Sequence, residues 1–127
     1  MKKNVLITGS EGFIGSHIVE SLIKKNYKVR AFVHYNSFNN IGWLKSLDSK
    51  ILKKIDIHFG DIRDEKNVLT AFKNMNYVIH LAALIGIPYS YHAPKSYIET
   101  NVLGTYNILE SSLKKKSKKN FNYFYFR

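Results

Sequence analysis

The fold of this chain is decided by residues 5–15, which read VLITGSEGFIG. The apolar run that opens this stretch is typical of a buried parallel strand, and it ends at Thr8-Gly9. From Ile14 to Leu22, apolar residues recur at four-residue spacing, which predicts an amphipathic helix. The stretch therefore predicts a strand, a glycine-rich turn and a helix in immediate succession.

Three glycines at three-residue spacing form this turn, and each has a mechanical role. Gly9 allows the sharp turn off the strand, Gly12 leaves room for a pyrophosphate beside the backbone, and Gly15 lets the helix pack close to the sheet. The first N–H groups of a helix are free to bind phosphate, because they have no partner within the helix. We therefore expect a dinucleotide to be bound by Gly9, Gly12, Phe13, Ile14 and Gly15.

The rest of the chain alternates strands with helices. Strands are predicted at residues 28–34, 55–59 and 77–82, and a helix is predicted within residues 61–74. Apolar strands that alternate with helices indicate an α/β fold, here a Rossmann-like NAD(P)-binding fold. Right-handed crossovers then give a parallel sheet with strand order 3-2-1-4.

The last predicted helix begins at Pro94, a residue that suits the first helical position. It carries apolar residues at helical spacing, which are Ile98, Val102, Leu109 and Leu113. Gly104 suggests that this helix packs closely on the sheet. Residues 35–50 are predicted to be a long connection with one helical turn near Trp43, and residues 83–93 are predicted to be a loop.

The pattern Gly-x-x-Gly-x-x-Gly resembles that of the short-chain dehydrogenase/reductase superfamily. The form of residues 12–15 resembles its extended branch, the NAD-dependent epimerase/dehydratase family, and residues 60–64, 80–83 and 97–110 match further motifs of that branch in order. Residues 35–39 and 87–91 look like the N-acetylglucosamine nucleotide 4,6-dehydratases of the legionaminic acid type. The resemblance covers residues 4–113.

The resemblance implies a role for each matched segment. Asp61 would contact the adenine amino group, and Ile62 would pack on the adenine ring. Asn101 would support the cofactor and the water network of the active site. The middle of the cofactor would be lined by Leu81, Ala82 and Ala83.

Residues 33–36 depart from the family pattern, in which the second strand ends in an acid that binds the ribose hydroxyls of NAD. The sequence here is Val33-His34-Tyr35-Asn36, with no carboxylate. His34 and Asn36 are able to bond those hydroxyls instead, and the lack of an acid removes a repulsion against the 2′-phosphate of NADP. NAD and NADP therefore both remain open as cofactors.

The catalytic groups of the family are a Ser or Thr and a Tyr-x-x-x-Lys pair, and we expect them beyond residue 127. Tyr91 and Lys95 have the spacing of that pair, but Pro94 would start a new helix between them, so they would not share a helical face. We expect residues 1–113 to form the dinucleotide-binding portion. Residues 114–127 would form a basic and aromatic tail, either an edge strand or a frameshifted end, so the chain would be an incomplete enzyme that lacks its C-terminal half.

The composition excludes several other classes of protein. The 127 residues fit one domain, and the lack of cysteine excludes disulfide scaffolds and thiolate metal sites, so no metal is predicted. No apolar run approaches the ~18 residues of a membrane span, which favours a cytoplasmic protein without a membrane partner. The net charge of +11 suggests nucleic acid, but many lysines lie where a helix ends and complement its dipole, so no nucleic-acid partner is predicted.

The leading interpretation is the NAD(P)-binding portion of a nucleotide-sugar 4,6-dehydratase or epimerase, which moves a hydride between the cofactor and C4 of the sugar. Its partner would be a nucleotide-sugar substrate, and the complete enzyme would be a homodimer. The alternative is a non-catalytic dinucleotide-binding module.

Overall fold

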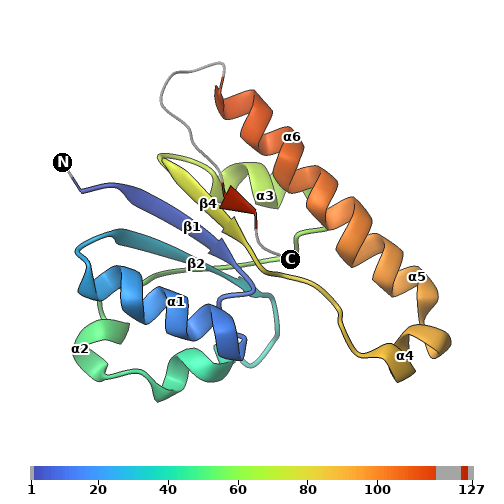
Figure 1. The fold of residues 1–127 in the computed structure, drawn as a ribbon, viewed down its shortest axis with the longest axis horizontal. Helices are drawn as coiled ribbons and strands as arrows, with labels where there is room; N and C mark the ends of the chain where they lie inside the picture. Colours follow the sequence, from blue (N-terminus) through green and yellow to red (C-terminus); the bar gives the residue numbers. More distant parts are fainter. Residues whose placement is uncertain (1, 117–123, 126–127) are drawn as a thin grey trace.

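The centre of the molecule is a parallel five-stranded sheet in the order β3-β2-β1-β4-β5 (Figure 1). The structure, a computed structural model, describes residues 2–116 and 124–125. The strands are β1 (Asn4–Thr8), β2 (Lys28–His34), β3 (Asp56–Gly60), β4 (Tyr77–His80) and β5 (Phe124–Tyr125). The predicted order of the first four strands is confirmed, and the short β5 extends the sheet beside β4, with Ile79 opposite Phe124.

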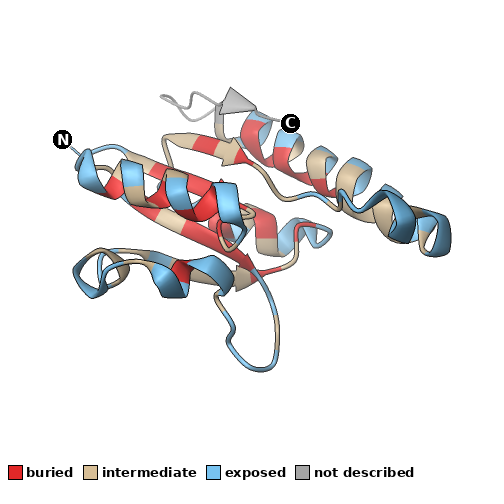
Figure 2. Cartoon of the chain, turned by 60° about the horizontal axis from the view of Figure 1, so that its bottom comes forward, coloured by how far each residue is buried: buried red, intermediate tan, exposed pale blue. Residues whose placement is uncertain are grey.

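The connections between the strands contain all the helical segments of the described residues. These are α1 (Phe13–Lys24), the 3₁₀ turn η1 (Gly42–Ser46), α2 (Ser49–Leu52), α3 (Glu65–Ala71), α4 (Ile87–His92), α5 (Pro94–Tyr97), the π-helical η2 (Ile98–Leu103) and α6 (Gly104–Lys116). α1 and α2 lie on one face of the sheet, and α3 and α6 lie on the other (Figures 1 and 2). The molecule therefore has the three layers expected of a Rossmann-like fold.

Each face of the sheet has its own hydrophobic core, seen as the buried layer of Figure 2. The core under α1 is built from Val5, Ile7, Val19, Ile23, Val29, Ala31, Val33 and Leu44. The core under α3 and α6 is built from Leu6, Phe32, Ile62, Val68, Ala71, Phe72, Val78 and Ile108. Successive residues of β1 alternate between the two cores, because successive side chains of a strand point to opposite faces. This explains why the middle of β1, Val5 to Ile7, is apolar without interruption.

Two short helices lie where the sequence predicts irregular chain. Asp48 caps α2, since its carboxylate accepts a hydrogen bond from the N–H of Lys50 at 2.8 Å. α4 falls within the segment predicted as a loop, and Pro88 occupies its first turn, where the missing N–H of proline costs no helical hydrogen bond. Both helices are too short to show an apolar period. By contrast, the predicted helical turn near Trp43 is confirmed as η1.

The apolar residues that recur along the last helix do not pack on the sheet. Ile98, Val102, Leu109 and Leu113 are exposed, and the side that packs inward carries one large apolar residue, Ile108, among small or polar ones, which are Gly104, Asn107, Ser111 and Ser112. These residues let α6 approach closely, and the Asn107 side chain donates to the carbonyl of Ile62 at 2.9 Å. α6 also continues past residue 113 to Lys116. No helix within residues 2–116 is long and apolar enough to cross a membrane.

Candidate functional site

The carboxyl ends of β1, β2, β3 and β4 lie at one edge of the sheet, because these strands are parallel. The predicted site residues follow these four strand ends, with the exception of Asn101. β2 and β3 follow on one side of β1 in the sheet, and β4 lies on its other side. The strand order therefore reverses beside β1, and α/β proteins bind ligands at such a switch point. The topology thus brings together segments that are far apart in sequence.

The glycine turn after β1 is tightly packed on one side and open on the other. Gly9 has φ +66°, and a Cβ there would lie 2.8 Å from the backbone nitrogen of Ala82. A Cβ on Gly15 would lie 2.1 Å from the carbonyl oxygen of Gly9. Gly12 differs, since its Cβ would meet only the Gly9 oxygen at 3.3 Å, and the residue is exposed. Gly9 and Gly15 therefore serve the fold, while Gly12 keeps the outer surface of the turn clear.

The first turn of α1 presents free hydrogen-bond donors at this surface. The N–H groups of Phe13, Ile14 and Gly15 have no acceptor among the described residues, whereas the N–H of Ser16 bonds the carbonyl of Gly12 at 3.0 Å. The Phe13 and Ile14 side chains are exposed and leave the backbone accessible from their side. The start of α1 is therefore suited to an anion, because it combines free N–H groups with the positive end of the helix dipole.

Thr8 and His80 join the end of β1 to the end of β4. The Thr8 hydroxyl oxygen accepts from the N–H groups of Leu81 at 3.1 Å and Ala82 at 3.2 Å. It also lies 2.6 Å from Nδ1 of His80, whose Nε2 is 3.1 Å from the Thr105 hydroxyl. Burial lowers the pKa of His80 to about 4, so the ring is neutral at pH 7. His80 is the buried, hydrogen-bonded residue that fixes this strand end.

Asn101 reaches the same edge through the backbone of Leu84. Its Nδ2 donates to the Leu84 carbonyl and its Oδ1 accepts from the Leu84 N–H, both at 2.8 Å. The amide thus holds the segment that follows Leu81, Ala82 and Ala83 as a neighbouring strand would. Asn101 lies in η2, and π-helical turns occur often at functional sites. Its predicted contact with a cofactor stays a prediction.

Asp61 and Ile62 follow β3 and are engaged by the protein itself. Both carboxylate oxygens of Asp61 accept hydrogen bonds from the Arg63 guanidinium, the shortest at 2.6 Å, and these bonds lower the pKa of Asp61. Ile62 is buried, and its side chain fills the space beside Gly104. A Cβ added to Gly104 would lie only 2.6 Å from the Cδ1 of Ile62. Gly104 therefore packs closely against Ile62, rather than on the sheet as the sequence suggested. The adenine contacts of both residues stay predictions.

The end of β2 carries a carboxylate that the sequence alone does not reveal. The N–H of His34 donates to Oε1 of Glu11 at 2.9 Å, so the acid comes from the glycine turn. The His34 side chain is exposed. Asn36 closes its own loop, since its Nδ2 donates to the carbonyls of His34 and Asn40 and its Oδ1 accepts from the Asn40 N–H. No periodicity predicts where a side chain between two turn glycines lies, so the sequence does not place the Glu11 carboxylate at the end of β2.

Tyr91 and Lys95 do not form a catalytic pair in this structure. Tyr91 lies on α4 and Lys95 on α5, and Ala93 breaks the helix between them with φ −133° and ψ 55°. The Lys95 ammonium lies 3.6 Å from Glu99 Oε1. The prediction that proline separates the two residues is confirmed.

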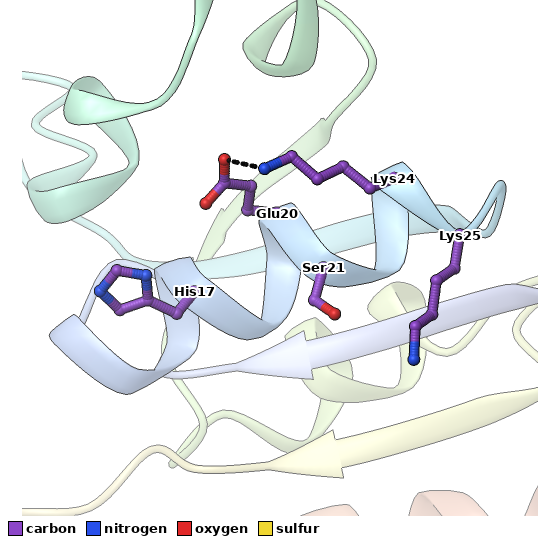
Figure 3. Close-up of a pocket in the computed structure, with 5 residues that line it drawn as sticks. All are labelled: His17, Glu20, Ser21, Lys24 and Lys25. Atoms are coloured by element: carbon purple, nitrogen blue, oxygen red, sulfur yellow. Dashed lines mark ion pairs between the residues drawn. The ribbon is translucent and has the colours of Figure 1, made fainter.

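A surface hollow lies along α1, from His17 near the start of the helix to Lys25 at its end (Figure 3). Its lining residues are His17, Glu20, Ser21, Lys24 and Lys25. Glu20 and Lys24 are paired with each other at 2.8 Å, as the dashed line in Figure 3 shows. None of these five is a predicted site residue. Within the ranges that the structure describes, no group of three His, Cys, Asp or Glu side chains is arranged to hold a metal ion.

Comparison with known proteins identifies the family of this chain. A family model described as GDP-mannose 4,6 dehydratase matches residues 6–126. The chain belongs to this family. The match places it in the NAD-dependent epimerase/dehydratase family of the short-chain dehydrogenase/reductase superfamily, as the sequence motifs predict.

Individual relatives and solved structures give the same assignment. The UDP-N-acetyl-alpha-D-glucosaminuronate decarboxylase of Bacillus cytotoxicus is 34% identical over 118 residues, which are 93% of this chain and 35% of that protein. The UDP-glucose 4-epimerase of Thermotoga maritima, solved with UDP-glucose, has a TM-score of 0.78 and 31% identity over 96% of this chain and 37% of its own. The UDP-glucose 4-epimerase of Thermus thermophilus, solved with NAD, has a TM-score of 0.74 and 30% identity over 89% and 34%. The chain thus spans about a third of the length of these proteins.

Proposed function

We propose that this chain binds NAD or NADP at the carboxyl edge of its sheet, as the cofactor-binding portion of a nucleotide-sugar 4,6-dehydratase or epimerase. The observation that carries the proposal is the start of α1, where three free N–H groups stand beside the open face of Gly12. The family assignment and the complex of the Thermus enzyme with NAD support it.

The residues of this edge fit a dinucleotide in extent and in chemistry. The N–H groups of Phe13, Ile14 and Gly15 suit the pyrophosphate, and the clearance at Gly12 lets it approach the backbone. Asp61 would have to exchange one of its hydrogen bonds from Arg63 for one from an adenine amino group, since each of its carboxylate oxygens already accepts two bonds from Arg63. The Ala82 and Ala83 side chains are small, so a ligand can cross the end of β4.

A bound nicotinamide cofactor would accept a hydride from a sugar carbon and supply the redox chemistry of the reaction. The residues described here would hold it and orient it. Proton transfer from a sugar hydroxyl needs a base, and the family uses a Tyr-x-x-x-Lys pair for that purpose. Tyr91 and Lys95 stand on separate helices, so we place the base outside this sequence and propose that the chain alone does not turn over a nucleotide sugar.

The second candidate function is a non-catalytic dinucleotide-binding module. The separation of Tyr91 from Lys95 supports this candidate as well as it supports the enzyme portion, because neither needs a catalytic pair within this chain. The two candidates differ in what happens when the chain is extended. A longer version of the protein that supplies a Ser or Thr and a Tyr-x-x-x-Lys pair should convert UDP-N-acetylglucosamine or a related nucleotide sugar. Mass spectrometry of the product distinguishes them, because a module would stay inactive.

We also propose that the exposed stripe of the last helix packs against a second copy of the chain. The stripe consists of Ile98, Val102, Tyr106, Leu109 and Leu113, which recur at three- or four-residue spacing and are 43–63% exposed. Such a stripe is self-complementary when two copies meet about a two-fold axis. An apolar surface of this length is uncommon on a monomer, which supports the homodimer.

Calorimetric titration with NAD and NADP tests cofactor binding at the turn. Gly12→Val should leave the chain folded, since Gly12 has an extended backbone (φ −73°, ψ 170°) and the Gly9 carbonyl, 3.3 Å from the new Cβ, needs to shift by only a few tenths of an ångström. The substitution should weaken dinucleotide binding by about tenfold or more. Gly86→Val is the matched control, because its Cβ would lie 3.4 Å from the Tyr97 hydroxyl and 4.0 Å from the Tyr89 Cβ, both of them side-chain atoms. Equal affinity of the wild-type and Gly12→Val chains would remove the turn from the site.

A further inference from the structure

Glu11 belongs to the glycine turn, yet its carboxylate lies at the end of β2. Oε1 accepts the hydrogen bond from the N–H of His34, the last residue of that strand. Oε2 is buried and has no hydrogen-bond partner among the described residues. A carboxylate oxygen without a partner is costly, so this oxygen favours a donor that a ligand could supply.

The loop after β2 fixes the backbone of Glu11. The Trp43 N–H donates to the Glu11 carbonyl at 2.9 Å. Gly42, with φ +54°, packs closely on the same carbonyl, since a Cβ added to Gly42 would lie 2.5 Å from the Glu11 carbonyl oxygen. The position of the Glu11 backbone is therefore set on one side by the turn and on the other by this loop.

An acid at the end of the second strand distinguishes the two nicotinamide cofactors. It accepts a hydrogen bond from the 2′-hydroxyl of the adenosine ribose, whereas it repels the doubly charged 2′-phosphate. That acid normally comes from the strand itself, roughly 20 residues after the glycine turn. In this chain the position belongs to His34, and the carboxylate beside it comes from Glu11.

We infer that Glu11 is the residue that makes this site select NAD over NADP. The inference rests on the proposed function and names a determinant for it. Glu11 would accept the ribose hydroxyl of NAD and would place a negative charge where NADP carries its phosphate. The turn thereby contacts the cofactor twice, through backbone N–H groups at the pyrophosphate and through this side chain at the ribose.

The other charged groups of this edge act in the same direction. A 2′-phosphate needs a cation, and Arg63 is already paired with Asp61 at 2.6 Å and with Glu99 at 3.7 Å. Asp61 adds a second negative charge near His34. Asn36 is the neutral side chain that the sequence suggested for the ribose, but its amide nitrogen donates to the carbonyls of His34 and Asn40. Glu11 supplies the carboxylate beside the end of β2.

The test is calorimetric titration of the 127-residue chain and of Glu11→Gln with NAD and with NADP. Wild type should prefer NAD by roughly ten- to hundredfold, as expected when a like charge faces the phosphate. Glu11→Gln keeps an oxygen for the His34 N–H and removes the charge, so this preference should fall at least about tenfold through tighter NADP binding. Glu20→Gln, on the outer side of α1, should change neither affinity.

The outcomes separate the inference from the function on which it rests. Binding of both dinucleotides by wild type without preference, or an unchanged preference in Glu11→Gln, would overturn the role of Glu11 alone. Binding of neither by the folded wild-type chain would overturn the proposed function as well. If Glu11→Gln does not fold, wild type still decides the matter, because a carboxylate at this position requires that the wild-type chain bind NAD more tightly than NADP. A wild-type chain that binds NADP at least as tightly as NAD would contradict it.

Discussion

His80 shows how one buried side chain ties stability to pH. It is 4% exposed, and burial lowers its pKa from 6.5 to about 4. The folded chain therefore binds this proton more weakly than the unfolded chain does. The stabilisation that follows is complete above pH 6.5 and is lost as the pH falls through the range from 6.5 to 4.

We predict that lowering the pH from 7 to 5 costs about 2 kcal/mol of the free energy of unfolding through His80 alone. Urea denaturation of wild type and His80→Gln at both pH values measures this, since glutamine can still bond Thr8 and Thr105 but does not titrate. His92→Gln is the control, because His92 is exposed on α4. An equal pH dependence in wild type and His80→Gln would show that protonation of His80 is not what destabilises the fold.

The last helical segment carries the main surface feature at the scale of elements. Pro94 to Lys116 forms one path of α5, η2 and α6, with Asn101 and Ile108 directed inward and the apolar stripe directed outward. The same element thus serves the strand-end site through Leu84 and offers a surface to a second copy. A change on the stripe should affect association and leave the site intact.

Leu109→Glu should weaken dimerisation by at least about a hundredfold, because a two-fold axis buries the residue twice and each lost leucine is worth roughly 1.5–3 kcal/mol. Sedimentation equilibrium measures the dissociation constant. Phe38→Glu replaces an equally apolar and more exposed residue outside the stripe and should have no effect. A wild-type chain that stays monomeric at high concentration would contradict the interface.

Local pattern predicts part of this structure, and the rest depends on contacts between distant segments. The glycine turn and the strand order follow from residues 5–15 and from the alternation of elements. Periodicity identifies the stripe with Leu109 but not the side that packs inward, because Ile108 and small residues provide the better fit to Ile62 and α3. The carboxylate of Glu11 could not be placed, since its position depends on β2 and on the loop with Gly42.

At the scale of the whole molecule, the parallel sheet explains why the candidate site exists. Four strands end at one edge, and each end supplies a different group: N–H donors after β1, the Glu11 carboxylate at β2, Asp61 after β3 and small residues after β4. The cores on the two faces hold these ends in register. The central claim is that a dinucleotide binds across this edge with its phosphates on the start of α1.

Amide NMR during titration with NAD tests this claim most directly, because it observes the free N–H groups themselves. The account predicts that the largest chemical-shift changes at saturation occur at Phe13, Ile14 and Gly15, with smaller changes at Asp61 and at Leu81 to Ala83. Amides on the far side of α1, around Lys24, should not move. A folded chain whose Phe13, Ile14 and Gly15 amides stay unshifted at saturating NAD, or whose largest changes lie elsewhere, would contradict it.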